Sequence, residues 1–459
     1  MNTIIMARML LPADYGVVAM AMLVVGLIQA LMDFGATTAL MRKAEVTPDE
    51  INSAWTLRIF QSVAVAILMI LVAPFATGYF KEPRVEYVLW TLAACVALAG
   101  AGNIGVTLAQ KQFNFALDFR LLVISKLLSV VATIGAGLYL RDYRALVIGI
   151  ATGYISGFIL SYAMHPYRPR WATNKISEIW AVTKWLMLAG VGGFVLRKGD
   201  ELMAARIGTT TEFGLYNVGA DLGQLPTAEV GPAMLRALLP VLTAIEGGTT
   251  AVNSAVLKTV SAVNTITLPI GFGFAAVAAP ATALILGPAW TGAVQFVAIF
   301  AFAGAIQIIQ GPFNTLLLMR GYTKIQNHAV WLEFLVFVVA AMALVPSFSL
   351  IGLVWARILG TVVNLIATIV AAHHYCELSL KRTFLTLLRP MTGAVLTYFT
   401  VLEVINYING DFLKICLGIV SGAVIFITWS LASWLIIGKP DGLESTLLSY
   451  FDKLFNQKK

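Results

Sequence analysis

The sequence predicts an all-α, polytopic membrane protein, and three observations support this fold class. Hydrophobic residues make up 59% of the 459 positions, only 12% are charged, and the mean hydropathy is +0.85. A soluble domain carries roughly 25% charged residues, so this chain has too few polar groups to cover a surface exposed to water. Apolar stretches long enough to cross about 30 Å of hydrocarbon as helices recur along the chain. They lack the strict apolar–polar alternation of a membrane β-barrel.

The apolar stretches predict thirteen complete membrane spans, separated by short polar segments. These spans lie near residues 14–41, 55–77, 87–110, 121–140, 145–164, 180–206, 213–242, 256–286, 291–318, 328–346, 350–372, 387–408 and 413–437. Residues 1–12 precede them, are interrupted by Arg8, and lack the cleavage site of a signal peptide. With this short segment counted as the first span, the total is fourteen.

A ten-residue phrase occurs twice, as ARMLLPADYG at 7–16 and ARIGTTTEFG at 205–214, which are 198 residues apart. Two weaker echoes follow in the same order, one of them Ala73-Pro74 with Ala279-Pro280. Six spans separate the two copies of the phrase, so both enter the membrane in the same sense. Such a duplication predicts two parallel six-helix bundles with a cavity between them. Two unrelated helical halves are the alternative.

The repeat predicts four parts of the chain. Residues 1–178 form an N-terminal bundle of spans 1–6, residues 179–378 a C-terminal bundle of spans 7–12, residues 379–437 two extra spans, and residues 438–459 a cytoplasmic amphipathic tail suited to the membrane interface. A full span begins near Trp180, upstream of the second copy. Its counterpart would begin before residue 1, so we expect the chain as given to lack most of its first membrane helix.

The repeated phrase also carries a resemblance to a known family. Residues 7–43 resemble the opening of bacterial oligosaccharide flippases, the polysaccharide transporter family within the MOP exporter superfamily, and residues 212–226 are similar to the family's second-half motif. The motif residues carried over are Arg8, Asp14, Gly16, Asp33, Gly35 and Arg42. The resemblance implies that undecaprenyl-pyrophosphate-linked oligosaccharide moves from the cytoplasmic to the periplasmic leaflet for lipopolysaccharide or exopolysaccharide synthesis. It also implies two six-helix bundles with a cationic cavity, although such proteins begin with a complete first span.

Charged residues deep within the spans are candidates for substrate binding, because a pyrophosphate in the membrane needs cationic partners and a water-filled path. The candidates are Arg197, Lys198, Asp221 and Arg357. Arg197, Asp221 and Arg357 lie roughly 10–14 Å below the periplasmic surface at 1.5 Å per residue, and we expect them to share one polar layer of the cavity. The alternative is local pairing of Arg197 with Asp200 or Glu201, and of Lys198 with Glu201, at helical spacing.

Three further charges are secondary candidates. Arg58, Lys126 and Glu333 lie three to six residues inside their spans. At this depth a long side chain can extend to the membrane interface, and we expect each of them to do so.

Lysine and arginine concentrate in the loops after even-numbered spans and in the C-terminal tail. Positive charge marks the cytoplasmic side, so we expect a bacterial inner-membrane protein with a cytoplasmic C-terminus. The net charge of +8 mostly reflects this topology, and we expect no nucleic-acid partner. The expected partners are a lipid-linked oligosaccharide, membrane lipids, and a polysaccharide polymerase or other assembly proteins.

Other motifs do not support catalysis. The sequence GAGNIG at 100–105 fits a dinucleotide fingerprint but has no strand before it, so its small residues indicate close helix packing. HHYCE at 373–377 has no second ligand cluster, and the three cysteines have no paired spacing. We therefore expect no enzyme, metal site or cofactor, and leave open whether H⁺ or Na⁺ drives transport. One span contains Pro226, Pro232 and Pro240, and the next contains Pro269 and Pro280. These prolines are candidate hinges, and static curvature around the cavity is the alternative.

Two other functions remain open from the sequence. A cation-coupled multidrug exporter of the same superfamily would share the fold but would line its cavity with acids and aromatic rings. A membrane polysaccharide polymerase would need a sizeable loop outside the membrane, whereas the polar breaks here are short.

Overall fold

The computed structural model describes residues 2–32, 46–236, 238, 242, 244–245 and 248–438. Every element assigned in these ranges is a helix, and nine of the helices are long and apolar enough to cross a membrane, or up to ten if a bent pair is one span. The predicted all-α polytopic fold is therefore confirmed. The chain divides into two compact units, Met1–Gly214 and Leu215–Lys459.

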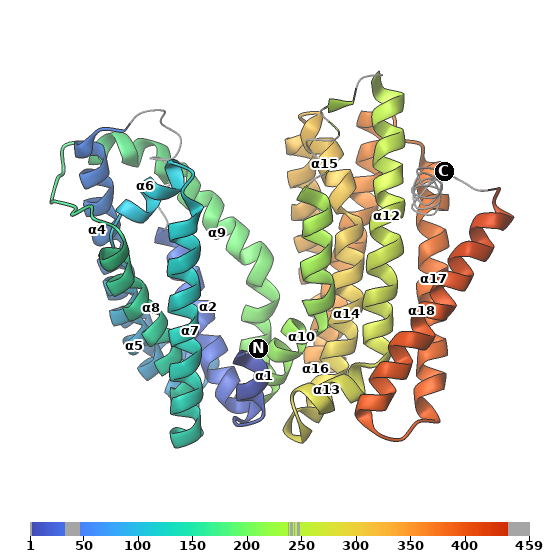
Figure 1. Cartoon of the computed structure of the whole chain (residues 1–459), viewed down its shortest axis with the longest axis horizontal. Helices are drawn as coiled ribbons and strands as arrows, with labels where there is room; N and C mark the ends of the chain where they lie inside the picture. The colour runs from blue at the N-terminus through green and yellow to red at the C-terminus, as the bar shows by residue number, and fades with distance from the viewer. Residues whose placement is uncertain are drawn as a thin grey trace, which may run out of the picture. The chain divides into compact units, whose positions relative to one another are not determined.

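The first unit contains eight described helices, drawn in blue to green in Figure 1. They are α1 (Asn2–Ala7), α2 (Pro12–Met32), α4 (Pro48–Phe80), α5 (Arg84–Gly100), α6 (Gly105–Lys111), α7 (Phe115–Leu140), α8 (Arg144–Met164) and α9 (Ile176–Ile207). Small residues let these helices approach closely. A Cβ on Gly149 of α8 would overlap Thr133 of α7, and the Ser129 hydroxyl donates to the Gly149 carbonyl at 2.8 Å.

The start of α4 shows how local sequence sets a helix boundary. The Thr47 hydroxyl accepts a hydrogen bond from the Glu50 backbone N–H at 3.4 Å, and the Glu50 carboxylate accepts one from the Thr47 N–H at 2.9 Å. This reciprocal pair satisfies two donors that a helix N-terminus otherwise leaves unpaired. Pro48, with its fixed φ, follows directly. The span predicted at 55–77 is therefore a longer helix.

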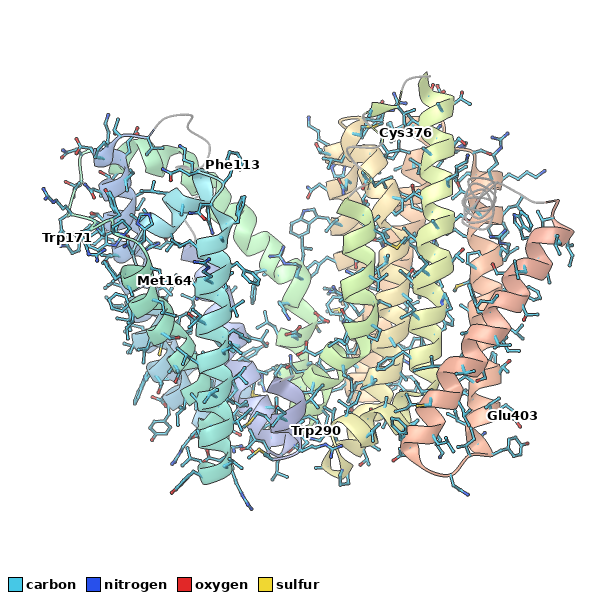
Figure 2. The ribbon with its side chains drawn as sticks, in the orientation of Figure 1. Phe113, Met164, Trp171, Trp290, Cys376 and Glu403 are labelled. Carbon is cyan, nitrogen blue, oxygen red and sulfur yellow. The ribbon has the colours of Figure 1, made fainter. Side chains whose placement is uncertain are left out.

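The second unit begins within α10 (Thr210–Arg236) and continues through eight more described helices, one of which, α16, consists of two halves. They are α12 (Gly248–Ala276), α13 (Ala278–Ile285), the 3₁₀ helix η1 (Pro288–Ala293), α14 (Val294–Ile309), α15 (Gly311–Met319), the two halves of α16 (Thr323–Cys376), α17 (Leu380–Asn406) and α18 (Asp411–Ile436). Figure 2 shows Cys376 and Trp290 at opposite ends of this unit.

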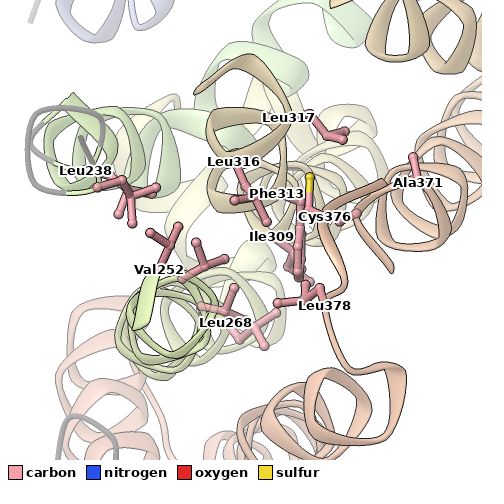
Figure 3. Packing of buried hydrophobic residues seen from close by; sticks show 14 of the residues in the cluster. Leu238, Val252, Leu268, Ile309, Phe313, Leu316, Leu317, Ala371, Cys376 and Leu378 are labelled. Carbon is pink, nitrogen blue, oxygen red and sulfur yellow. The ribbon is translucent and has the colours of Figure 1, made fainter. Parts of the chain in front are cut away.

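The core of the second unit forms where α12, α14, α15 and α16 meet. Its buried side chains include Leu268, Ile309 and Phe313, which gather between the helices in Figure 3. Glycines bring α10 against α14, since a Cβ on Gly223 would lie 2.5 Å from the Val297 carbonyl oxygen. The neighbouring Gly219 contacts Phe296 in the same way. This four-residue spacing is typical of close helix packing in membranes.

The 54-residue helix α16 is in fact two helices joined at Ser349, whose φ of 50° and ψ of −132° are not helical. The break lies at the boundary between the two spans predicted at 328–346 and 350–372. Gly352 packs beside the Leu344 backbone, where a Cβ would lie 2.6 Å from the carbonyl oxygen. The two halves therefore turn back on each other as a hairpin.

Three predicted spans are divided rather than continuous. The span at 87–110 is α5 and α6 with a 60° bend, the span at 256–286 is α12 and α13, and most of the span at 291–318 is α14 and α15. The breaks lie at or near glycine or proline, which weaken or interrupt the helical hydrogen-bond ladder. Asp33, Gly35, Arg42, Pro240 and the amphipathic tail beyond residue 438 lie outside the described residues.

Candidate functional site

The two copies of the repeated phrase build the same local structure. Pro12 begins α2 and Thr210 begins α10, at the offset of 198 seen in the sequence. In the first copy the Asp14 carboxylate accepts a hydrogen bond from the Leu11 N–H at 3.1 Å. In the second copy the Glu212 carboxylate accepts one from the Thr209 N–H at 2.8 Å. Equivalent carboxylates thus cap equivalent helices, which supports the duplication.

The glycines that end the two copies contact the opposite copy. A Cβ on Gly16 would overlap the carbonyl oxygen of Thr210, and a Cβ on Gly214 would overlap the carbonyl oxygen of Pro12. Because Thr210 is the counterpart of Pro12, the contact is reciprocal, as at an interface with two-fold symmetry. The motif residue Gly16 is therefore required for close approach of two helix starts.

A polar network surrounds this contact at one end of the first unit. Asp14 is buried, and its second carboxylate oxygen accepts from the Tyr143 N–H at 3.1 Å. The Glu82 carboxylate accepts two hydrogen bonds from the Arg84 guanidinium at 2.8 Å and one from the Thr210 hydroxyl at 2.8 Å. The Arg84 hydrogen bonds lower the pKa of Glu82 to about 2 despite its burial. In this structure Asp14 and Glu82 hold the repeated phrase in place, while Arg8 is exposed just after α1.

The α9 cations have distinct surroundings. Lys198 forms an ion pair with Glu201, as the local-pairing alternative predicts. Arg197 is exposed, and its guanidinium lies over Gly193, with Nη1 3.2 Å from the position that a Cβ there would occupy. The missing side chain of Gly193 thus makes room for Arg197 to lie along the helix surface.

Asp221 and Arg357 both belong to the second unit. Asp221 is exposed on α10, and Arg357 is half-buried on the second half of α16. Their participation with Arg197 in a shared polar layer stays a prediction.

Arg58 forms hydrogen bonds with backbone groups inside the first unit, and its extension to the membrane interface stays a prediction. Its guanidinium donates to the carbonyl of Gly100 at 2.9 Å and also to the carbonyl of Gly102. The indole N–H of Trp55 donates to the same Gly102 carbonyl at 3.1 Å. The break between α5 and α6 interrupts the backbone hydrogen bonds of the helix at these carbonyls. Arg58 supplies hydrogen-bond donors to them there. Lys126, by contrast, is exposed on α7.

The GAGNIG segment therefore has two roles. Close packing is confirmed, because a Cβ on Gly100 would overlap Ser62 and one on Gly105 would overlap the His165 ring. The segment also forms the 60° bend between α5 and α6.

The half-buried carboxylate of Glu333 is hydrogen-bonded inside the second unit. One oxygen accepts from the Thr361 hydroxyl at 3.2 Å, and the other accepts from the Asn364 side-chain amide at 2.6 Å. Gly360 allows this approach, since a Cβ there would lie only 2.9 Å from the Glu333 carbonyl oxygen. The two halves of α16 are thus joined by a polar contact within an apolar bundle.

Two further residues extend this contact into a network. The Gln310 amide donates to the Thr361 carbonyl at 3.0 Å, at the break between α14 and α15. The Thr368 hydroxyl donates to the Asn364 carbonyl at 2.7 Å. We name the set the Glu333 cluster, and its members are Gln310, Glu333, Thr361, Asn364 and Thr368. Apart from Glu333, all are less than 9% exposed. Such a cluster can take up a proton or a small cation.

Four members of this cluster carry no charge, and for that reason the sequence does not single them out. A signal was present, since Thr361, Asn364 and Thr368 are spaced by three and four residues on one face of an apolar helix. Neutral polar residues are common inside membrane helices, so the spacing alone does not point to a carboxylate on another helix.

Comparison with solved structures shows the class of fold. The chain superposes on the lipid II flippase MurJ in an inward closed conformation with a TM-score of 0.76, at 9% identity, covering 95% of this chain and 96% of that chain. It superposes on an inward-facing multidrug-resistance MATE family transporter of the MOP superfamily with a TM-score of 0.60, at 13% identity, covering 82% of this chain and 93% of that chain. The fold is that of these polytopic transporters.

Sequence comparison shows the family. Residues 5–295 match the family described as polysaccharide biosynthesis protein, and the chain belongs to it. It is 20% identical over 369 residues to the teichuronic acid biosynthesis protein TuaB of Bacillus subtilis strain 168, covering 79% of this chain and 76% of that relative. It is 19% identical over 329 residues to the lipopolysaccharide biosynthesis protein WzxC of Escherichia coli K12, covering 70% and 66%. The resemblance carried by the repeated phrase is confirmed.

Another relative is a named transport protein. The succinoglycan biosynthesis transport protein ExoT of Rhizobium meliloti is 22% identical over 311 residues, covering 66% of this chain and 62% of that relative.

Proposed function

We propose that this protein moves an oligosaccharide linked to undecaprenyl pyrophosphate from the cytoplasmic to the periplasmic leaflet of the bacterial inner membrane. The product supplies surface or exopolysaccharide assembly. The observation that carries the proposal is the family match over residues 5–295, on a chain with the fold of a lipid flippase. The named relatives act in teichuronic acid, lipopolysaccharide and succinoglycan biosynthesis. The C-terminus is cytoplasmic in this proposal, and a polysaccharide polymerase uses the delivered product.

In this proposal Arg197 and Arg357 bind phosphate oxygens during transport. A guanidinium offers a planar pair of donors that matches phosphate and keeps its charge at physiological pH. Arg197 is exposed in the first unit, which supports its access to a substrate. Lys198 forms an ion pair with Glu201. In this proposal Lys198 and Asp221 adjust the net charge of the substrate-binding site.

The Glu333 cluster is our proposed coupling site. A carboxylate among neutral donors inside an apolar bundle changes its hydrogen bonds when it takes up H⁺ or coordinates Na⁺. Both halves of α16 and the α14–α15 break contribute to the cluster. Ion uptake would therefore alter the packing of these segments, and that change can be linked to substrate movement.

A deletion strain tests the transport function. We expect lipid-linked repeat units to remain on the cytoplasmic leaflet, and the chain supplied in trans to restore their delivery. The measurement is the accessibility of the glycan to a membrane-impermeant reagent in spheroplasts. Normal delivery in a deletion strain with no redundant exporter would reject the proposal. Drug sensitivity is measured in parallel, because a multidrug exporter would alter it while leaving glycan delivery intact.

Replacement of Glu333 tests the coupling. In proteoliposomes, Glu333→Gln should remove most of the dependence of transport on an imposed H⁺ or Na⁺ gradient, while Glu403→Gln, which alters an exposed carboxylate on α17, should not. Unchanged gradient dependence in Glu333→Gln would show that coupling occurs elsewhere.

A further inference from the structure

A cavity of about 390 Å³ opens in the second unit between α12 and α17. Each helix contributes one face, with residues spaced by three and four positions. The polar lining comes from Ser254, Lys258 and Ser261 on α12 and from Arg382, Thr386 and Arg389 on α17. We name this cavity the α12–α17 pocket. Lysine and arginine supply all the formal charge among the described residues that line it.

The cations of the α12–α17 pocket are graded in depth. Lys258 and Arg382 are exposed at its mouth, whereas Arg389 is only 9% exposed. Seven residues of helix separate the two arginines, or roughly 10 Å at 1.5 Å per residue. The indole N–H of Trp429 on α18 donates to the Arg389 carbonyl at 3.3 Å, which fixes the backbone at the base. A ligand that enters here meets positive charge along the whole depth.

The rim of the pocket is apolar and faces outward. Leu385 is 51% exposed and Ile437 is 57% exposed, and both line the opening. On a membrane helix such side chains contact acyl chains. A free phosphate ion would gain nothing from them, whereas a lipid would place its headgroup among the cations and its chains along the rim.

We propose that the α12–α17 pocket binds the phosphate headgroup of an anionic phospholipid. The guanidinium and ammonium groups donate charge-assisted hydrogen bonds to phosphate oxygens, and the Ser254, Ser261 and Thr386 hydroxyls supply further hydrogen-bonding groups. Basic pockets between membrane helices bind anionic headgroups in this way. The bound lipid bridges α12 and α17 and stabilises their contact. This site is additional to the proposed transport function.

The test uses the purified full-length protein after removal of its native lipid. Phosphatidylglycerol or phosphatidylcholine is titrated, and bound lipid is counted by native mass spectrometry while the unfolding midpoint is recorded. We expect phosphatidylglycerol to bind and to raise the midpoint more than phosphatidylcholine does. The double variant Lys258→Gln with Arg382→Gln should bind phosphatidylglycerol at least about tenfold more weakly, because two headgroup cations are lost.

A matched control removes the same charge outside the pocket. Lys324 and Lys381 are exposed, and neither lines the cavity. The double variant Lys324→Gln with Lys381→Gln should bind phosphatidylglycerol within about twofold of the wild type, because it leaves the pocket cations in place. If the first double variant does not purify, the single variants Lys258→Gln and Arg382→Gln give the same comparison.

Several outcomes would overturn the proposal. One is equal weakening in both double variants, which would indicate only a general surface charge effect. Equal binding of phosphatidylcholine would exclude recognition of an anionic headgroup. Displacement of phosphatidylglycerol by equimolar inorganic phosphate would identify a free-phosphate site. Displacement by undecaprenyl pyrophosphate with the same dependence on Lys258 and Arg382 would instead identify a site for the transported lipid.

Discussion

Arg58 and Lys126 lie at similar depths in their predicted spans, yet the structure gives them different roles. The Arg58 guanidinium donates hydrogen bonds to two backbone carbonyls at the α5–α6 break, whereas Lys126 is exposed on α7. The difference follows from what each faces, because an interrupted helix exposes carbonyls that need donors. The role of a charged residue near the end of a span therefore depends on the backbone groups beside it as well as on its depth in the span.

At the residue scale, we expect Arg197→Ala and Arg357→Ala each to reduce glycan delivery by about tenfold or more, because each removes a proposed phosphate partner. Lysine at either position should restore part of the activity, since it supplies charge without the paired donors. Delivery is measured in the complemented deletion strain, with membrane levels checked by immunoblot. Lys126→Ala serves as the control for loss of an exposed cation. Full delivery by the alanine variants would exclude these arginines from the substrate path.

Glu82 predicts a pH dependence of stability. Its pKa is about 2 in the folded protein and 4.5 in its usual range. Because the folded state favours the ionised form, this contribution is complete above pH 4.5 and is lost as the pH falls toward 2. We expect Glu82→Gln to lower the unfolding free energy by about 1–3 kcal/mol at pH 7, and by less at low pH. Thermal unfolding in detergent across this range measures the effect.

The neighbouring Glu86→Gln is the control for Glu82→Gln. It removes a carboxylate from the first turn of α5 without touching the Arg84 hydrogen bonds that the structure assigns to Glu82. The same pH profile in both variants would mean that the Glu82–Arg84 contact contributes nothing specific.

At the scale of elements, glycine lies at the close contacts between helices and at several of the breaks within predicted spans. Glycines at 100 and 105 flank the α5–α6 bend, and Gly360 brings the halves of α16 together at Glu333. In a membrane, helices associate largely through packing and polar contacts, since lipid is as apolar as the side chains. Small residues therefore fix which helix faces meet.

We expect Gly16→Ala and Gly214→Ala each to destabilise the protein by about 1–3 kcal/mol, because the new Cβ would overlap a backbone oxygen of the other copy of the phrase. Gly78→Ala and Gly135→Ala are matched controls, since a Cβ at either helical position meets nothing within 4 Å. Alanine favours helix, so these controls should be neutral or slightly stabilising. Unfolding midpoints in detergent give the comparison. Equal effects at all four positions would contradict the assigned contact.

At the scale of the whole molecule, topology is open to direct test. In a variant with its three cysteines replaced by serine, Asn409→Cys should react with an impermeant maleimide in spheroplasts. Lys324→Cys should react only after lysis, because its loop carries the positive charge expected on the cytoplasmic side. Asn114→Cys should behave like Lys324→Cys. The opposite labelling pattern would reverse the proposed orientation and place the C-terminus in the periplasm.

Much of the architecture follows from the order of residues along the chain. The length of each apolar stretch can be compared with the bilayer thickness, so the sequence predicts long membrane helices, including the pair that forms the two halves of α16. The repeat is visible in the sequence because its identities recur at a fixed offset, and Pro12 and Thr210 begin equivalent helices. The same residues carry the resemblance to the family.

Only the tertiary structure decides the polar contacts inside each unit. Glu333 meets Thr361 and Asn364 across 28 and 31 residues, and Arg58 meets Gly100 across 42. Such contacts depend on where a helix breaks and on which face it turns toward its neighbour. Hydropathy measures how apolar a stretch of sequence is. It does not show which face of a helix turns toward a neighbouring helix. For that reason the sequence does not predict that packing at glycine brings Arg58 and Glu333 to polar groups inside their units.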